Sequence, residues 1–309
     1  MKKILLLFAI AGMFLFACKK EHSSTTSPLG KKYKVSFNVT NFAQQHTGFS
    51  LGHHPAVNAL GDTVSVKALN LLYFYVFDSN GNRVTRVIQD STMADMGMVA
   101  DSLPAGTYNV VAIAGQKGLI TGNDDSLAPT AFFGYGGFNW QDTFFGRLSL
   151  TVSDQNISKD ITLGRTIAKL DVKLLDAIPN SANTLSLSII PEYSDIALGS
   201  TPGSPHPTNT GTVDSGKHAI TIPVSAKGTT NFAFGMFVSN TSKLMEAHIV
   251  CRDASNHIIA SAVVENVHCT VNQKTILSGN LFGGVPGSSP QSFTVKVDTA
   301  WGNTTHIGF

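Results

Sequence analysis

The sequence predicts an all-β fold built from two Greek-key β-sandwiches in tandem. Only 14% of its residues are charged, and it holds 28 glycines with many Val, Ile, Thr and Phe residues, which is typical of β-rich extracellular proteins. Short apolar runs are separated by turn residues, and none shows a helical period of useful length. The chain after its first 30 residues exceeds the usual size of one domain, so two domains are expected, at residues 31–164 and 165–309.

The first sandwich is expected to begin with a strand at residues 33–39, where apolar and polar side chains alternate. An apolar and aromatic run at 69–78 predicts a strand buried on both faces. The turn residues 78–82 then predict a hairpin whose second arm covers 83–88. Further strands are predicted at 64–66, at 107–114 after a turn containing Pro and Gly, at 147–152 and at 159–163.

The second sandwich is expected to start after Gly164 and Arg165. Eight short runs separated by turn residues follow, which favours another Greek-key sandwich over alternating strands and helices. They lie at residues 168–174, 184–189, 218–224, 231–238, 244–252, 257–267, 275–280 and 292–297.

The N-terminus has the pattern of an export signal. Two lysines precede an unbroken apolar run, 4–16, that is too short to span a bilayer as a mature helix, and a small residue then precedes Cys18. This arrangement resembles the lipobox of bacterial lipoproteins, whose cysteine is diacylated and becomes the first residue of the mature chain. We therefore predict a signal peptide at 1–17 and an acylated flexible tether at 18–30, whose polar residues cannot bury a core. An ordinary cleaved signal with a chance cysteine is the alternative.

The charge balance argues against a nucleic-acid partner. Removing Lys2 and Lys3 with the signal leaves 20 of the 22 basic residues, against 20 acidic ones. Binding to nucleic acid by release of counterions needs a basic excess, which this chain lacks.

Two thiols remain after the predicted cleavage, Cys251 and Cys269. An oxidising compartment makes a disulfide between them one interpretation, and two buried free cysteines are the other.

The residues that could take part in catalysis or bind a metal ion are scattered along the sequence. Asp214-Ser215-Gly216 resembles the serine environment of some proteases, but there is no Gly-x-Ser-x-Gly motif, and a turn is the simpler interpretation. His248 and Cys251 differ by an odd number of positions, so on a strand they point to opposite faces and cannot chelate one metal ion. The same parity separates His268 from Cys269. No catalytic residue, metal or other cofactor is therefore expected.

The most unusual composition is that of residues 132–145, which hold seven aromatic residues among fourteen. Their glycines argue against a regular core strand, while so many aromatic rings are costly to leave in water. Three interpretations stand side by side: an internal plug, a contact with another subunit, and a platform for sugar rings. In the last two, the candidate contact residues are Tyr135, Phe138 and Trp140.

Several segments, taken in order, resemble the fimbrillin superfamily of Bacteroidetes, in particular the FimB/Mfa2-like fimbrial subunits and anchor lipoproteins. Each motif is weak alone, and their order and spacing carry the resemblance. Besides Cys18 they are residues 71–81, 103–108, 163–170, 272–282 and 293–298 with Trp301.

The resemblance implies two transthyretin-like sandwiches, export as a lipoprotein, and assembly at the cell surface. In shaft subunits of the superfamily, an arginine-specific protease removes the first strand, and a strand of the next subunit fills the exposed groove by β-augmentation. This chain departs from that pattern, because its first two arginines are Arg83 and Arg86 and none lies between Phe42 and the second strand. We therefore expect it either to keep its first strand or to be processed at another residue type.

These observations predict a non-enzymatic fimbrial (pilus) subunit, anchor or accessory protein, held on the outer membrane by acyl chains and exposed at the cell surface. Its expected partners are other fimbrial subunits, bound by exchange of the strand at 33–39 or of the C-terminal strand beginning at Ser292. Its place in the fimbrium, and any ligand on host or bacterial surfaces, are left open. The alternative is a surface glycan-binding lipoprotein of a polysaccharide-uptake system.

Overall fold

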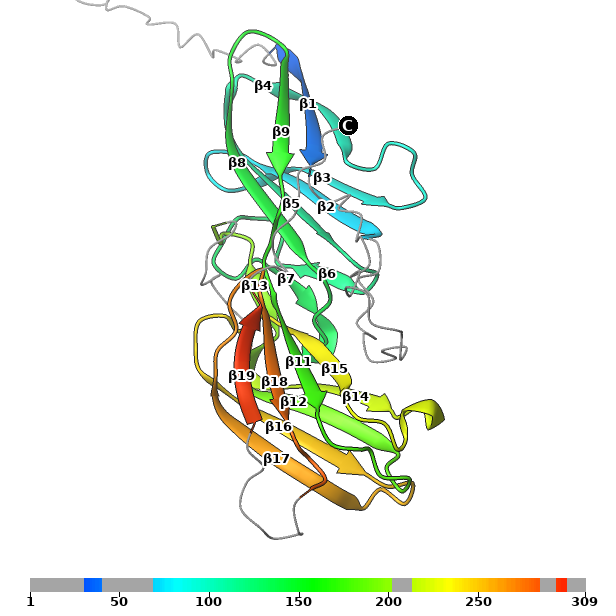
Figure 1. Cartoon of the computed structure of the whole chain (residues 1–309). Helices are drawn as coiled ribbons and strands as arrows, with labels where there is room; N and C mark the ends of the chain where they lie inside the picture. The colour runs from blue at the N-terminus through cyan, green and yellow to red at the C-terminus, as the bar shows by residue number, and fades with distance from the viewer. Residues whose placement is uncertain (1–30, 41–68, 202–212, 284–292, 299–309) are drawn as a thin grey trace, which may run out of the picture.

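The computed structural model describes residues 31–40, 69–201, 213–283 and 293–298, and within them it consists almost entirely of β-strands (Figure 1). Two single-turn 3-10 helices, η1 (Gly136–Phe138) and η2 (Val224–Ala226), interrupt the strands. The all-β prediction is confirmed. None of the helices in the described ranges has the length and apolar character needed to cross a membrane.

The first sandwich contains a three-stranded and a five-stranded sheet, in the orders β4-β1-β9 and β10-β8-β5-β2-β3. Apolar side chains of both sheets meet in one core, since alternate residues of each strand point inward. The strands are β1 (Lys32–Thr40), β2 (Leu71–Phe77), β3 (Arg83–Asp90), β4 (Met98–Pro104), β5 (Gly106–Gly115), β8 (Phe144–Val152), β9 (Ile157–Thr162) and β10 (Gly164–Arg165).

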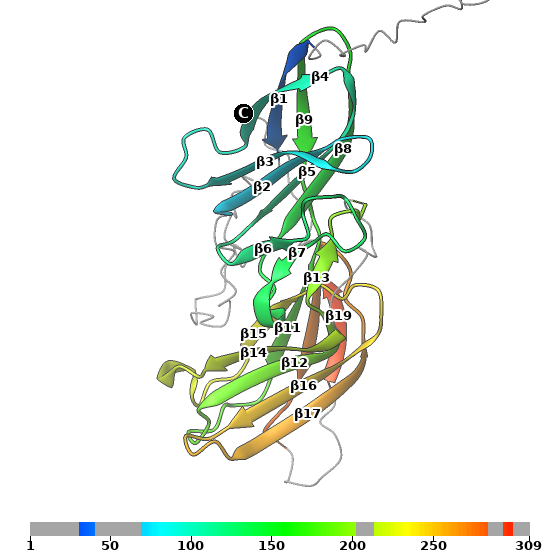
Figure 2. The same cartoon turned by 180° about the vertical axis from the view of Figure 1, so that it is seen from behind.

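The second sandwich has two four-stranded sheets, in the orders β15-β11-β18-β19 and β14-β12-β16-β17. They enclose a second apolar core, and Figures 1 and 2 show this body from opposite sides. The strands are β11 (Ala168–Leu174), β12 (Thr184–Tyr193), β14 (Val213–Thr221), β15 (Phe232–Val238), β16 (Met245–Arg252), β17 (Ile258–Val267), β18 (Lys274–Gly279) and β19 (Phe293–Asp298).

The two sandwiches repeat one topology. In the first, β1 pairs antiparallel with β4 and parallel with β9; in the second, β11 pairs antiparallel with β15 and parallel with β18. The opposite sheets also correspond, because the order β3-β2-β5-β8 matches β14-β12-β16-β17. The two sandwiches differ at two edges: β10 continues the sheet of the first beyond β8, and β19 continues the sheet of the second beyond β18.

A small third sheet lies between the two bodies (Figure 2). Its order is β13-β7-β6, with β6 at Leu119–Gly122, β7 at Phe132–Tyr135 and β13 at Asp195–Ala197. A third core forms here from residues of both halves of the chain, among them Tyr75, Phe133 and Phe237. The sheet containing β2 is thus covered on both faces, which confirms the prediction for residues 69–78.

Some strand predictions need correction. The strands β4, β6 and β13 match no predicted strand, and β7 begins the segment 132–145, whose glycines argue against a regular core strand. Gly134 permits β7 because a Cβ atom there would lie 2.5 Å from the carbonyl oxygen of Ser194, the residue just before β13. The glycine allows the close pairing with β13 instead of preventing a strand.

Several predictions lie outside the described residues: the signal peptide at 1–17, Cys18, the tether at 18–30, the strand at 64–66 and Trp301. The domain division at residues 164 and 165 stays a prediction. The strand β10 spans these two residues and still pairs with β8 of the first sandwich.

Candidate assembly site

The first strand, β1, is the central strand of its sheet. It has seven register pairs with β4 and six with β9. Its inward side chains Val35, Phe37 and Val39 are at most 2% exposed, and the Phe37 ring lies 4.9 Å from that of Phe74 between ring centroids. Removing this strand would leave a long apolar groove with unpaired backbone groups on both sides, which is the geometry that a donated strand can fill.

The last described strand, β19, is an edge strand. It pairs antiparallel with β18 over six residues. Its core-facing positions 293, 295 and 297 are apolar, as are those of β1, but Val295 and Val297 are 48% and 44% exposed. The first and the last described strands thus have a similar apolar alternation, but the inward face of β1 is buried, whereas that of β19 is largely exposed.

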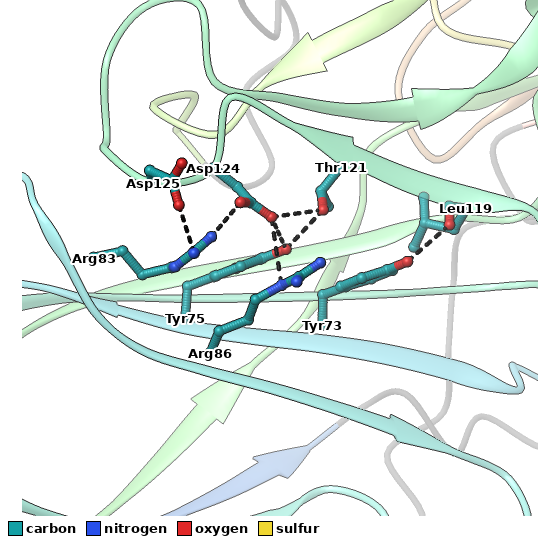
Figure 3. Close-up of polar contacts among 8 residues, drawn as sticks. All are labelled: Tyr73, Tyr75, Arg83, Arg86, Leu119, Thr121, Asp124 and Asp125. Atoms are coloured by element: carbon teal, nitrogen blue, oxygen red, sulfur yellow. Dashed lines mark hydrogen bonds and ion pairs between the residues drawn. The ribbon is translucent and has the colours of Figure 1, made fainter.

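Polar contacts clamp the segment 119–127 onto the outer face of β2 and β3 (Figure 3). The Tyr75 hydroxyl lies 2.8 Å from Thr121 Oγ1 and 2.7 Å from Asp124 Oδ2. Arg83 forms an ion pair with Asp124, and Arg86 Nε lies 3.6 Å from the same carboxylate. Burial by itself would raise the pKa of Asp124, but hydrogen bonds from Tyr75 and Thr121 and the two positive charges lower it below its ordinary value.

The same arginines are the first two in the sequence. Both lie within β3, which pairs with β2, and Arg83 also forms a 2.5 Å ion pair with Asp125. The first arginines after β1 therefore belong to a paired strand and to a network of ion pairs, and not to the connection between β1 and β2.

The two sandwiches are joined through Arg165. Its guanidinium holds both oxygens of Asp142, at 2.6 Å and 3.0 Å, and donates to the Asn272 side-chain oxygen at 2.8 Å. It also lies 4.8 Å from the centre of the Phe144 ring. Asp142 and Phe144 belong to the first half of the chain and Asn272 to the second. The Arg165 side chain therefore links the two halves through these three contacts. Sequence reasoning missed this contact, although residues 163–170 and 272–282 both stood among the motifs that carried the resemblance.

Another buried polar group, Glu192, ties the end of β12 to the turn after β15. Its carboxylate is fully buried and accepts hydrogen bonds from the backbone N–H groups of Tyr193, Ser239 and Asn240 and from the Ser239 hydroxyl. Burial raises the pKa of Glu192 to about 7, although these hydrogen bonds act in the opposite direction.

The raised pKa of Glu192 predicts a pH-dependent stability. The pKa of Glu192 is about 7 in the folded protein, against an ordinary value of 4.5. The stabilisation that the protonated Glu192 gives to the folded state is therefore present in full below pH 4.5 and is lost as the pH rises to about 7. We expect the free energy of unfolding, relative to that of Glu192→Gln, to fall by roughly 3 kcal/mol across this window. Urea unfolding of both proteins at about pH 4.5 and pH 8 measures the difference.

The comparison with Glu192→Gln removes the effects of other groups. Burial lowers the pKa of His218, which acts in the opposite direction, but both proteins carry this histidine. An equal difference between the two proteins at both pH values would contradict the prediction.

The aromatic candidates do not form a surface platform. Tyr135 and Trp140 are 5% and 3% exposed, their rings meet edge to face at 5.9 Å, and the indole N–H donates to the Tyr193 carbonyl oxygen. Phe138 is half-buried and ends η1. The segment forms much of the core between the sandwiches, as in the plug interpretation. Neither Tyr135 nor Trp140 presents an open ring face to a sugar or another subunit.

Both remaining thiols are free and buried in the structure, which is the second of the two interpretations of Cys251 and Cys269. Burial raises the pKa of Cys251 to about 11 and that of Cys269 to about 12, so both stay protonated near neutral pH. These are packing residues of the second core.

The other chemical candidates are dispersed over the second sandwich. Asp214 and Ser215 belong to β14, so the predicted turn there is a strand. His248 Nε2 lies 3.2 Å from Glu246, and His257 Nδ1 lies 3.4 Å from Asp253. Within the described ranges, no three His, Cys, Asp or Glu side chains gather as metal ligands would.

Two β-sandwiches with a shared core between them place the described chain in the class of all-β proteins built from two tandem sandwiches. The chain belongs to the family of fimbrillin-A associated anchor proteins Mfa1 and Mfa2, whose model matches residues 58–305. This family consists of fimbrial anchor proteins and not of enzymes. The protein is thus a fimbrial protein associated with the cell surface.

Solved structures similar to this chain include the fimbrial anchor protein Mfa2 from Porphyromonas gingivalis, with 12% identity, a TM-score of 0.49, and coverage of 87% of this chain and 98% of that one. A candidate cell adhesion protein from Parabacteroides distasonis has 12% identity, a TM-score of 0.48, and coverage of 87% and 99%. A comparison with curated proteins gives no match. The family assignment rests on the match over residues 58–305.

Proposed function

We propose that this chain is a lipid-anchored fimbrial anchor or accessory subunit, which keeps its first strand and joins neighbouring fimbrial subunits by exchange of β-strands. The observation that carries the proposal is the match of residues 58–305 to a family of fimbrial anchor proteins. Acyl chains on Cys18 would attach the protein to the outer membrane, and residues 18–30 would hold the two sandwiches, 31–164 and 165–309, away from it.

Retention of β1 is supported by its packing and by the positions of the arginines. The strand contributes Val35, Phe37 and Val39 to the core of the first sandwich. The next arginines in the chain, Arg83 and Arg86, lie in the paired strand β3. A cut after either one would break a sheet and not a connecting segment, so an arginine-specific protease has no accessible site that releases β1 alone.

The anchoring proposal predicts that Cys18→Ala abolishes acylation. We expect the native protein to incorporate labelled palmitate and to fractionate with the outer membrane, and the variant to incorporate none and to leave that fraction. Cys251→Ala serves as the matched control, since it removes a thiol from the buried core without touching the N-terminus. A Cys18→Ala protein that is still acylated and still in the outer membrane would refute the proposal.

A further inference from the structure

The repeated topology makes two sheet edges directly comparable. The strands β9 and β18 are equivalent, because each runs parallel to the first strand of its sandwich. In the described part of the chain, β9 ends its sheet, whereas β18 is followed by β19. A sheet edge offers unpaired N–H and C=O groups to any strand that fits, so the side chains at the edge decide what can be added.

The β9 edge carries a charge where an added strand would need an apolar neighbour. Residues 157, 159 and 161 share the core-facing side of this strand, and Ile161 is 1% exposed in the core. Lys159 lies between the two isoleucines on that side and is exposed. An inward-directed lysine on an edge strand discourages the addition of another strand.

The β18 edge has no such charge on its core-facing side. The corresponding residues are Thr275, Leu277 and Gly279, and all three are buried. Of the two equivalent edges, only β18 is therefore chemically suited to accept a strand, and β19 covers it.

Most of the β19 side chains contribute little to holding it there. Phe293 packs against the second core, but Val295 and Val297 are about half exposed, in contrast to Leu277 of β18, which is 0% exposed. The strand is held chiefly by its backbone pairing with β18 and by contacts at its two ends.

The end contacts are specific. At one end the Phe293 ring lies directly on Gly279, where a Cβ atom would be only 2.7 Å from Phe293 Cγ. At the other end Lys274 Nζ lies 3.7 Å from Asp298 and 3.8 Å from Asp171. The β18 edge thus offers two contacts to an added strand. Gly279 leaves room for an aromatic ring, and Lys274 provides a positive charge for a carboxylate five residues further along that strand.

We propose that the β18 edge is a strand-accepting site that recognises an aromatic residue at Gly279 and an acidic residue at Lys274, and that its external occupant is β19 of a second copy of this chain. A second copy carries the same Phe and Asp at the matching spacing, and reciprocal exchange produces a closed pair with two-fold symmetry. The inference rests on the proposed assembly by strand exchange and specifies a site and a partner for it.

The test uses the full mature chain and a fluorescent peptide of residues 291–299. Fluorescence anisotropy should show binding of the native peptide, at least tenfold weaker binding when the peptide carries Phe293→Ala, and a few-fold weaker binding with Asp298→Asn. In the protein, Gly279→Ala should abolish capture because its Cβ occupies the place of the ring. Gly283→Ala is the matched control, since its nearest neighbour is an Asp176 oxygen 3.9 Å away.

Whether the strand that occupies the β18 edge comes from a second copy of this chain is tested with two differently tagged full chains. Mixed and co-purified, they should form a dimer that Gly279→Ala prevents and Gly283→Ala preserves. The absence of peptide binding would overturn the site. Binding unaffected by Gly279→Ala would also overturn it, while leaving the proposed strand exchange in place at another edge. Peptide capture without any mixed dimer would overturn the assignment of a second copy as the partner.

Discussion

Replacing Arg165 with alanine should lower the free energy of unfolding by about 3–5 kcal/mol, because the change leaves a buried carboxylate without its partner. Asp142 is 0% exposed, and both of its oxygens are held by this guanidinium. Urea unfolding at neutral pH measures the effect. Arg252→Ala is the matched control, since that arginine donates at the surface to the Asn256 carbonyl oxygen, and should change stability by less than about 0.5 kcal/mol.

A double-mutant cycle separates the ion pair from the remaining contacts of Arg165. The double variant Arg165→Ala with Asp142→Ala should lose clearly less than the sum of the two single losses, because the second change removes the unpaired charge that the first creates. Strictly additive losses, or a loss below about 1 kcal/mol for Arg165→Ala, would contradict the role of this contact in joining the sandwiches.

Phe37→Ala should also cost about 3–5 kcal/mol of stability, because it opens a cavity in the core of the first sandwich. The side chain is 2% exposed and packs against Phe74. Lys34→Ala on the same strand is the control: its side chain is exposed, and its backbone pairing is unchanged. The comparison therefore measures how strongly core packing, and not backbone pairing alone, retains β1.

Hydrogen exchange gives a second measurement on the Phe37→Ala protein. Backbone amides of β1 should exchange faster in this variant than in Lys34→Ala, since loss of packing promotes local opening of the strand. Equal exchange and equal stability in the two variants would show that β1 is held without its apolar face, which would remove the packing argument for its retention.

Local sequence patterns were sufficient for most strands. The alternation that ends in Val39 predicted β1, and the apolar aromatic run around Phe74 predicted a strand covered on both faces. The strand β4 was missed because its only fully buried apolar residues are Val99 and Leu103, so the alternation is weak. A two-residue periodicity is recognisable only where enough apolar residues carry it.

Contacts between distant parts of the chain could not be predicted from such patterns. Gly134 argued against a strand because its partner in β13, Asp195, lies about sixty residues further along. Arg165 meets Asn272 across a separation of 107 residues. No local sequence signal reveals such pairings. For the same reason the sequence leaves both a surface and an interior position open for Trp140, which the structure places in the third core, between the two sandwiches.

We propose that this protein attaches a fimbrium to the outer membrane through Cys18, and immunogold labelling with negative-stain imaging of cells can test this attachment. Gold should lie at the bases of cell-attached fimbriae for the native protein, and with detached fimbriae in the medium for Cys18→Ala. Cells of the Cys18→Ala strain that keep labelled fimbriae on their surface would contradict it.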